Sequence, residues 1–176
     1  MSIGQSIIVR DSEIKDAPGL MALDELVWNE RTAPASLSWK TRGEFLRHTP
    51  PGTQLVAVQD ETLCGYIGFR PPTLLASNSH VLEINIAVHP RYQRRGIGSA
   101  LMNALLEQTA QRGVKKISLR VLSSNISALT FYQKCGFVEE GRLFGEFYIE
   151  GQYVDDILMA YYLDGIYSRI SWQEGS

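Results

Sequence analysis

A strand, a glycine-containing turn and a helix follow one another between residues 81 and 113 and constrain this chain more than any other segment. In "VLEINIAV", residues 81–88, every second position holds a large aliphatic residue, while the opposite face carries Glu83 and Asn85. This alternation predicts a β-strand. After the turn "HPRYQRRGIGSA", an apolar stripe at helical spacing predicts an amphipathic helix from Gly98 to about Gly113. The three features together indicate an α/β fold.

The turn is suited to binding an anion. The first-turn N–H groups of a helix lack intrahelical partners, and the helix dipole favours negative charge there. Gly96 and Gly98 remove side chains that would block the backbone, and Arg94 and Arg95 can add cationic donors. The P-loop pattern is absent, and the dinucleotide fingerprint requires a glycine or alanine where Leu101 stands. The turn therefore predicts a phosphate-bearing ligand other than ATP or NAD.

The rest of the chain reads as further short strands and helices, which predicts one α/β domain with a mixed central sheet of about seven strands and helices on both faces. The domain is expected to span residues 1–176, with a core at about 6–163 and a tail at 164–176. Asp16 is expected to cap the first helix, and Ser124 or Asn125 a later one that ends at Gly136. The expected order is a strand at 6–12, helices at 17–27 and 41–49, a hairpin at 53–72, the strand, turn and helix at 81–113, a strand at 115–122, a helix at 124–136, and a final hairpin at 144–163 that turns at Glu150-Gly151.

Composition excludes several classes of function. A net charge of −2 without any block of five like charges gives no support for nucleic-acid binding. No apolar stretch approaches the roughly 20 residues that span a bilayer, and the N-terminus lacks the features of a signal peptide, so no membrane association is expected. Cys64 and Cys135 have no C-x-x-C or zinc-type spacing, which predicts packing roles, no metal and a cytoplasmic protein.

Two motifs carry a resemblance to a known family. "AVHPRYQRRGIGSALM" resembles the Q/R-x-x-G-x-G/A pyrophosphate-binding signature of the GNAT superfamily of N-acetyltransferases. "NISALTFYQKCGF" is similar to the family's N-x-x-A-x-x-x-Y-x-x-x-G-F pattern, with Asn125, Ala128 and Tyr132 at the first three positions. The 26 residues between the motifs hold one helix and one strand, as the family's fold requires. The C-terminal part resembles bacterial members that acetylate small amines, amino acids or protein α-amines.

The resemblance implies acetyl-CoA as the acyl donor, and no metal. Its pyrophosphate would lie on the N–H groups of residues 93–99, and its pantetheine arm beside strand 81–89, where that strand splays from strand 116–122. The small side chain of Ala87 is consistent with a close approach by the ligand. The residues that would contact acetyl-CoA are Ile86, Ala87, Val88, Gln93, Arg94, Arg95, Gly96, Ile97, Gly98, Ser99, Asn125, Ala128 and Tyr132.

The implied chemistry is direct attack of an amine on the thioester in a ternary complex. An alkylamine with a pKa near 10.4 is neutral about once in a thousand at pH 7, a cost of roughly 4–5 kcal/mol, so a base is useful. Glu83 is the candidate base, directly or through water, and Tyr132 the proton donor to the departing thiolate. The Val88 N–H can stabilise the oxyanion. One of Asp155 and Asp156, which point to opposite faces of a strand, could meet a substrate ammonium.

Each role has a structural alternative. Tyr132 could be a core aromatic, Glu83 could be paired with a neighbouring base, Asn85 could be a positioning or purely structural group, and one of Arg94 and Arg95 is expected to be a solvated surface charge.

The sequence thus predicts an N-acetyltransferase acting on a primary amine of a small molecule or peptide. A non-catalytic acyl-CoA sensor, or an acyltransferase that uses a longer acyl group, is the alternative. The final hairpin carries more apolar surface than one side of a small sheet usually buries, which predicts a homodimer. Its apolar residues are Phe147, Tyr148, Tyr153, Leu158, Tyr161 and Tyr162.

Overall fold

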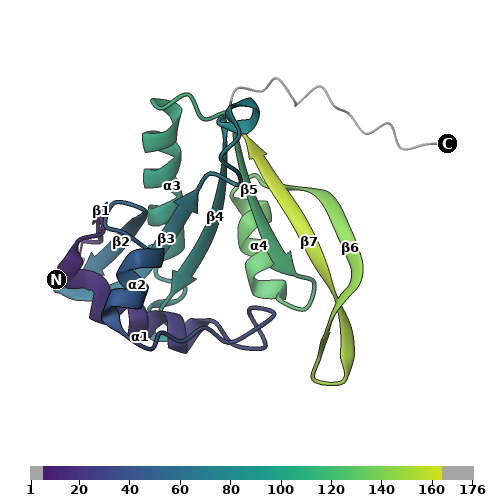
Figure 1. Ribbon diagram of the computed structural model, residues 1–176, viewed down its shortest axis with the longest axis horizontal. Coiled ribbons are helices and arrows are strands. Elements are labelled where there is room, and N and C mark those ends of the chain that lie inside the picture. Colours follow the sequence, from purple (N-terminus) through teal and green to yellow (C-terminus); the bar gives the residue numbers. More distant parts are fainter. Residues whose placement is uncertain (1–5, 164–176) are drawn as a thin grey trace, which may run out of the picture.

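Within residues 6–163, which the computed structural model describes, seven strands form one mixed sheet in the order β1-β2-β3-β4-β5-β7-β6 (Figure 1). The predicted tail at 164–176 lies outside these residues. Neighbouring strands are antiparallel except β4 and β5, which are parallel. The strands are β1 (Ile8–Asp11), β2 (Gln54–Gln59), β3 (Thr62–Arg70), β4 (Val81–Val88), β5 (Lys116–Leu122), β6 (Val138–Ile149) and β7 (Gln152–Tyr162).

The helices cover both faces of the sheet, as the sequence predicts. On one face, α1 (Ala17–Val27) and α2 (Arg42–His48) enclose a core cluster that includes Leu20, Phe45 and Tyr66. On the other, α3 (Ile97–Ala110) and α4 (Ile126–Lys134) pack on a larger cluster. The observed order of helices and strands is the predicted one. None of the described helices is long and apolar enough to cross a membrane.

Two-residue turns close both hairpins that the sequence predicts. Asp60 and Glu61 link β2 to β3 with φ angles of 49° and 61°. Glu150 and Gly151 link β6 to β7 with φ angles of 49° and 79°. Positive φ at both central residues is the geometry whose twist matches that of antiparallel strands, which explains why the strands pair without a longer loop.

Asp16 does not cap α1, contrary to the prediction. Its own backbone is already helical, with φ −78° and ψ −14°, whereas a capping side chain reaches the first turn from an extended residue. Its carboxylate instead accepts hydrogen bonds from the Arg10 guanidinium at 2.7 and 2.9 Å and from the Glu13 N–H at 2.7 Å. Asp16 therefore ties β1 to the short turn that precedes the helix.

β4 and β5 separate after a short paired stretch, where the sequence places the splay. They pair only from Val81 with Lys116 to Glu83 with Ser118, and then diverge toward the lower part of Figure 1. At the far end of β4, the His89 N–H donates to the Cys64 carbonyl on the β3 side. Because successive strand N–H groups point to opposite sides, those of Val88 and Ile86 face the gap left by β5.

Candidate active site

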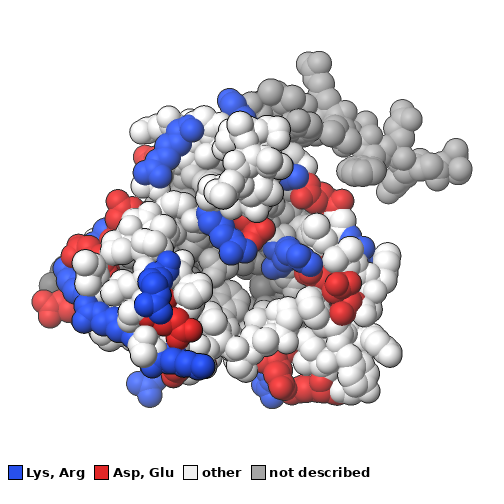
Figure 2. All heavy atoms as spheres, in the orientation of Figure 1, with Lys and Arg blue, Asp and Glu red and all other residues white. Residues whose placement is uncertain are grey.

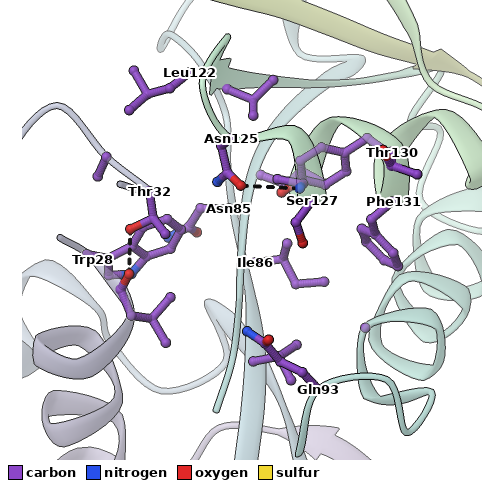
Figure 3. Close-up of a pocket in the computed structure, with 18 of the residues that line it drawn as sticks. Trp28, Thr32, Asn85, Ile86, Gln93, Leu122, Asn125, Ser127, Thr130 and Phe131 are labelled. Carbon is purple, nitrogen blue, oxygen red and sulfur yellow. Dashed lines mark hydrogen bonds between the residues drawn. The ribbon is translucent and has the colours of Figure 1, made fainter. Parts of the chain in front are cut away.

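A cavity of about 1080 Å³ opens where β4 and β5 separate. Figure 2 shows the hollow near the centre of the face that carries α1, with acidic and basic side chains at its border. In Figure 3, Trp28 and Thr32 face Ser127 and Phe131 across the cavity, with Ile86 between them. The lining thus comes from both faces of the sheet, and we call the two parts the α1 side and the α3–α4 side.

The alternation of side chains along β4 and β5 assigns their lining residues to the α1 side or to the α3–α4 side. On β4, Ala87 packs in the α1 core cluster, so Asn85 also faces the α1 side, and Ile86 and Val88 face the other. On β5, Leu119 and Val121 pack with α3 and α4, which directs the residues between and after them to the α1 side. The α1 side is lined by Val27, Trp28, Thr32, Ala33, Pro34, Asn85, Arg120, Leu122, Phe147 and Asp156.

The glycine turn forms one end of the cavity on the α3–α4 side. Gly96 begins α3 with φ +81°, and Arg94 before it has φ +61°. The two glycines have different functions. Gly96 supplies the left-handed backbone, while a Cβ on Gly98 would lie 3.0 Å from the Phe131 ring of α4. Gly98 is therefore small because two helices approach each other there, a reason that the sequence alone does not reveal.

Most of the residues predicted to bind acetyl-CoA line this cavity. The exceptions are Ala87 and Arg95. The Ala87 side chain is 1% exposed and packs under α1, and Arg95 lies over the Tyr92 ring at 5.3 Å. Of the two predicted arginines, Arg94 lines the cavity and Arg95 does not. The predicted residues in the lining are Ile86, Val88, Gln93, Arg94, Gly96, Ile97, Gly98, Ser99, Asn125, Ala128 and Tyr132.

Helix α4 carries Tyr132 and begins at Asn125, one of the two predicted caps. The Asn125 side chain accepts a hydrogen bond from the Ala128 N–H at 3.3 Å. Tyr132 is 6% exposed and packs between the rings of Phe131 and Phe137. Burial raises the pKa of the Tyr132 phenol well above its usual value, with a smaller contribution from Cys135. The phenol is therefore protonated at neutral pH and can act as a proton donor.

Glu83 lies outside the cavity lining. Its carboxylate accepts hydrogen bonds from the Arg70 guanidinium at 2.7 and 3.2 Å, which is the pairing with a neighbouring base named as the alternative. Asn85, two residues further along the same face, lines the cavity. Its amide oxygen covers Gly68 on the neighbouring strand β3. Asn85 is thus held in place between Glu83 and the open part of the cavity.

A buried carboxylate supports the wall behind Trp28. Asp24 is 2% exposed and accepts hydrogen bonds from the Tyr66 hydroxyl at 2.5 Å and from the Trp39 indole at 2.7 Å. The Trp28 indole donates to both Asp24 and the Tyr66 oxygen. Burial raises the pKa of Asp24 although these three donors oppose the shift. The network fixes Trp28 at the edge of the cavity.

An arginine–aspartate pair on the α1 side was not predicted as a unit. Arg120 on β5 donates through Nε and Nη2 to the Oδ2 atom of Asp156 on β7, with the Nε contact at 2.7 Å. Asp155, the other predicted acidic candidate, binds Arg142 and the Gly145 N–H instead. The period-two pattern of β5 is the sequence signal that places Arg120 on this face. Asp156 lies 36 positions away, so no local pattern connects the two residues. No cluster of three or more metal-binding side chains occurs in residues 6–163.

The sequence model of the Acetyltransferase (GNAT) family matches residues 20–137, which include β4, the glycine turn and α4. The chain belongs to the GNAT family. Among curated GNAT relatives, the L-amino acid N-acetyltransferase AaaT of Escherichia coli K12 is 32% identical over 166 residues, covering 88% of this chain and 96% of that protein. The ribosomal protein bS18-alanine N-acetyltransferase of the same organism is 46% identical over 55 residues, covering 31% of this chain and 37% of that protein.

Solved structures agree with the GNAT fold. A protein from Streptococcus mutans UA159 has a TM-score of 0.82 at 29% identity, covering 89% of this chain and 99% of that one. The phosphinothricin acetyltransferase of Sinorhizobium meliloti, solved in complex with acetyl-CoA, has a TM-score of 0.79 at 19% identity, covering 90% of this chain and 89% of that one. The second likeness extends to the fold alone.

Proposed function

We propose that this protein transfers the acetyl group of acetyl-CoA to the primary amine of an amino acid or peptide. The observation that carries the proposal is a cavity that passes between β4 and β5 and is lined on both faces of the sheet. One substrate can enter from the α3–α4 side and the other from the α1 side, so they meet at the gap. The names of the curated relatives, an amino-acid and a protein-alanine acetyltransferase, support an amine acceptor.

The α3–α4 side fits acetyl-CoA, which supplies an activated acetyl thioester. The first turn of α3 offers unpaired N–H groups to a pyrophosphate, and Arg94 and Lys134 add positive charge there. The N–H groups of Ile86 and Val88 face the gap, and that of Ile86 can pair with the pantetheine arm as an added strand would. Asn125 and Ala128 border the same path.

Residues at the gap provide the proton transfers. The amine nitrogen attacks the thioester carbon, and the Tyr132 hydroxyl donates its proton to the sulfur as the carbon–sulfur bond breaks. The Val88 N–H stabilises the negative charge on the carbonyl oxygen. The amine proton leaves toward Glu83 through water beside Asn85, because Glu83 itself is bound to Arg70 and does not line the cavity.

Release of free thiol from acetyl-CoA over a panel of amines tests this function. The panel contains an L-amino acid, a peptide with a free N-terminus and a polyamine, and mass spectrometry identifies the product. We expect thiol release that depends on the amine and matches the amount of N-acetylated product. If acetyl-CoA binds in calorimetry but no amine accelerates thiol release, the protein is an acyl-CoA sensor.

We further propose a single-domain, cytoplasmic homodimer. The reduced thiols Cys64 and Cys135 are compatible with the cytoplasm. The β6–β7 hairpin exposes Phe144, Tyr148 and Tyr153 at 81%, 67% and 77%, an apolar patch that a second copy could cover. Light scattering at micromolar concentration should give the mass of two chains, and a monomer mass would contradict the proposal.

A further inference from the structure

The Arg120–Asp156 pair has an arrangement that an ordinary surface ion pair lacks. The Asp156 side chain is only 5% exposed, whereas that of Arg120 is 53% exposed and borders the cavity. Both Arg120 donors reach the same oxygen, Oδ2. A guanidinium has five N–H groups, so three remain, and Arg120 makes no other hydrogen bond to the described part of the chain. Asp156 thus fixes one edge of the guanidinium and leaves the other available.

The strand register holds this geometry rigidly. Asp156 on β7 lies directly opposite Leu122 on β5, two residues after Arg120 on the same face. The pair is therefore built on two hydrogen-bonded strands instead of a loop. An arginine fixed along one edge is a preorganised receptor for a carboxylate, because the guanidinium fork matches two carboxylate oxygens.

The charges around the cavity favour an acceptor with a negative end. Of the lining residues, only Arg94, Lys134, Arg120 and Asp156 are charged, and the first two lie on the α3–α4 side. On the α1 side, the single acidic residue is already bound to Arg120. A polyamine would meet one neutralised carboxylate and a free guanidinium edge. The surrounding wall is apolar, formed by Val27, Ala33, Pro34 and Phe147, among others.

We infer that Arg120, oriented by Asp156, binds the α-carboxylate of a free amino acid, so that the acceptor is an α-amino acid and not a polyamine or a protein N-terminus. This inference rests on the proposed acetyltransferase function. It assigns Arg120 as a substrate-binding residue and Asp156 as a positioning residue, and the apolar wall faces the amino acid's side chain.

Leucine and leucinamide separate the carboxylate from every other feature of the substrate. Leucine suits the apolar wall, and leucinamide keeps the same side chain while an amide replaces the carboxylate. The amide's amine is less basic and hence more often neutral, which biases the comparison against the inference. We expect kcat/KM for leucine to exceed that for leucinamide, for a leucine-initiated dipeptide and for spermidine by at least about tenfold. Equal or better use of any of these three overturns the inference.

Variants of Arg120 and Asp156 test whether these residues cause the preference for leucine over leucinamide. Arg120→Met keeps the length of the side chain and should raise KM for leucine about tenfold or more, while kcat/KM for leucinamide changes less than about twofold. Asp156→Asn should likewise lower the ratio of kcat/KM for leucine to kcat/KM for leucinamide. Arg120→Lys should retain only part of the wild-type ratio. Arg142→Met is the matched control, since Arg142 forms carboxylate pairs away from the cavity and its loss should leave the ratio unchanged.

Two results would overturn the assignment. If Arg120→Met lowers kcat/KM for leucine and for leucinamide equally, Arg120 does not bind the carboxylate. The wild-type comparison decides the question even if this variant fails to fold. If acetyl-CoA binds and no amine at all is acetylated, the proposed function fails, which is a different result from acetylation that ignores the carboxylate.

Discussion

Tyr132 and Asp16 illustrate how the surroundings of a single residue set its protonation. Tyr132 lies among aromatic rings, where burial raises the pKa of its phenol and keeps it protonated at neutral pH. Asp16 is also buried, but its hydrogen bond from Arg10 outweighs the cost of burial and lowers its pKa. Similar burial therefore has opposite consequences, depending on whether a charged partner is present.

Replacing Tyr132 by phenylalanine removes the hydroxyl and keeps the ring packing. Because the lost interaction forms as the thioester breaks, kcat and kcat/KM should fall together by roughly 10–300-fold. The affinity for acetyl-CoA should change less than about threefold, as measured by calorimetry. Tyr161→Phe is the control, since Tyr161 packs on Phe137 outside the cavity lining. A wild-type rate, with chemistry shown to be rate-limiting, would make Tyr132 a core aromatic only.

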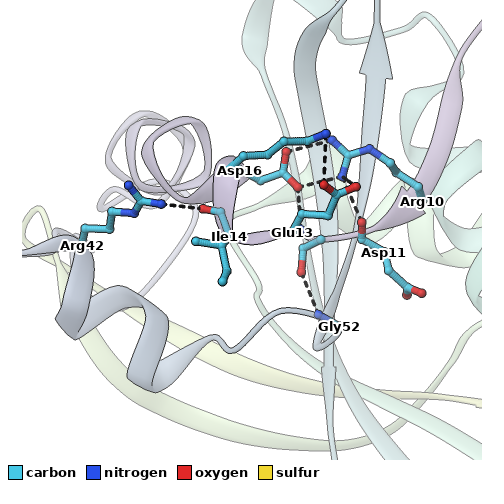
Figure 4. A network of polar contacts seen from close by, with 9 residues as sticks. Arg10, Asp11, Glu13, Ile14, Asp16, Arg42 and Gly52 are labelled. Atoms are coloured by element: carbon cyan, nitrogen blue, oxygen red, sulfur yellow. Dashed lines mark hydrogen bonds and ion pairs between the residues drawn. The ribbon is translucent and has the colours of Figure 1, made fainter.

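The lowered pKa of Asp16 predicts that the free energy of unfolding depends on pH. Figure 4 shows the network in which Arg10 and the Glu13 N–H bind its carboxylate. A carboxyl group with a lowered folded-state pKa stabilises the fold above its unfolded pKa, and this stabilisation is lost as the pH falls through the folded value. Asp16→Asn should reduce the free energy of unfolding by about 1–3 kcal/mol at pH 7. In urea titrations, the difference from wild type should shrink below about pH 4.

Asp11→Asn provides the matched control for this experiment, because the exposed Asp11 carboxylate makes no hydrogen bond within residues 6–163. This substitution should leave the free energy of unfolding nearly unchanged throughout the titration series. A difference for Asp16→Asn that stays constant down to strongly acidic pH would show that the ionised carboxylate is not the stabilising species.

At the scale of elements, local sequence patterns predict most of the fold. Period-two alternation finds β4, and glycines with positive φ follow α4 at Gly136 and close the last hairpin at Gly151. Helix α3 ends at Ala110, three residues before the predicted end at Gly113. The glycine turn at the start of α3 follows from the same local signals. A pattern within ten residues is enough for each of these features, because backbone geometry decides them.

Contacts between elements are the part that the sequence cannot supply. Arg120 meets Asp156, and Glu83 meets Arg70, only because β5 pairs with β7 and β4 with β3 in a particular register. A shift by one residue would turn each side chain to the other face. The reason for a glycine at position 98 likewise becomes visible only when the Phe131 ring of α4 is placed beside it. The sequence therefore offers Glu83 either as a base or as half of an ion pair, but it cannot identify Arg70 as the partner.

The start of α3 gives a prediction at this scale. Ser99 is exposed, lines the cavity and lies in the first turn, where an added carboxylate interacts well with the helix dipole but repels a pyrophosphate. Ser99→Asp should thus keep or slightly raise the melting temperature while weakening acetyl-CoA binding about tenfold or more in calorimetry. Asn103→Asp adds the same charge one turn further along α3 and should bind normally. Undiminished binding by Ser99→Asp would remove the pyrophosphate from this turn.

At the scale of the whole molecule, the separation of β4 and β5 connects the two faces of one sheet. The α3–α4 side offers the start of helix α3, where the proposal places the pyrophosphate, and the α1 side offers the Arg120–Asp156 pair. Neither cysteine lines the cavity: Cys64 is buried in the core and Cys135 lies outside the lining. The arrangement therefore favours direct transfer between two substrates that are bound at the same time, without an acetylated cysteine.

Initial-rate kinetics with both substrates varied test this central claim most directly. Simultaneous binding from the two faces predicts double-reciprocal lines that intersect when the acetyl-CoA concentration is varied at several fixed amine concentrations, and no acetylated protein by mass spectrometry. Parallel lines, together with a protein whose mass increases by one acetyl group when it is mixed with acetyl-CoA alone, would show transfer through a covalent intermediate and contradict the account.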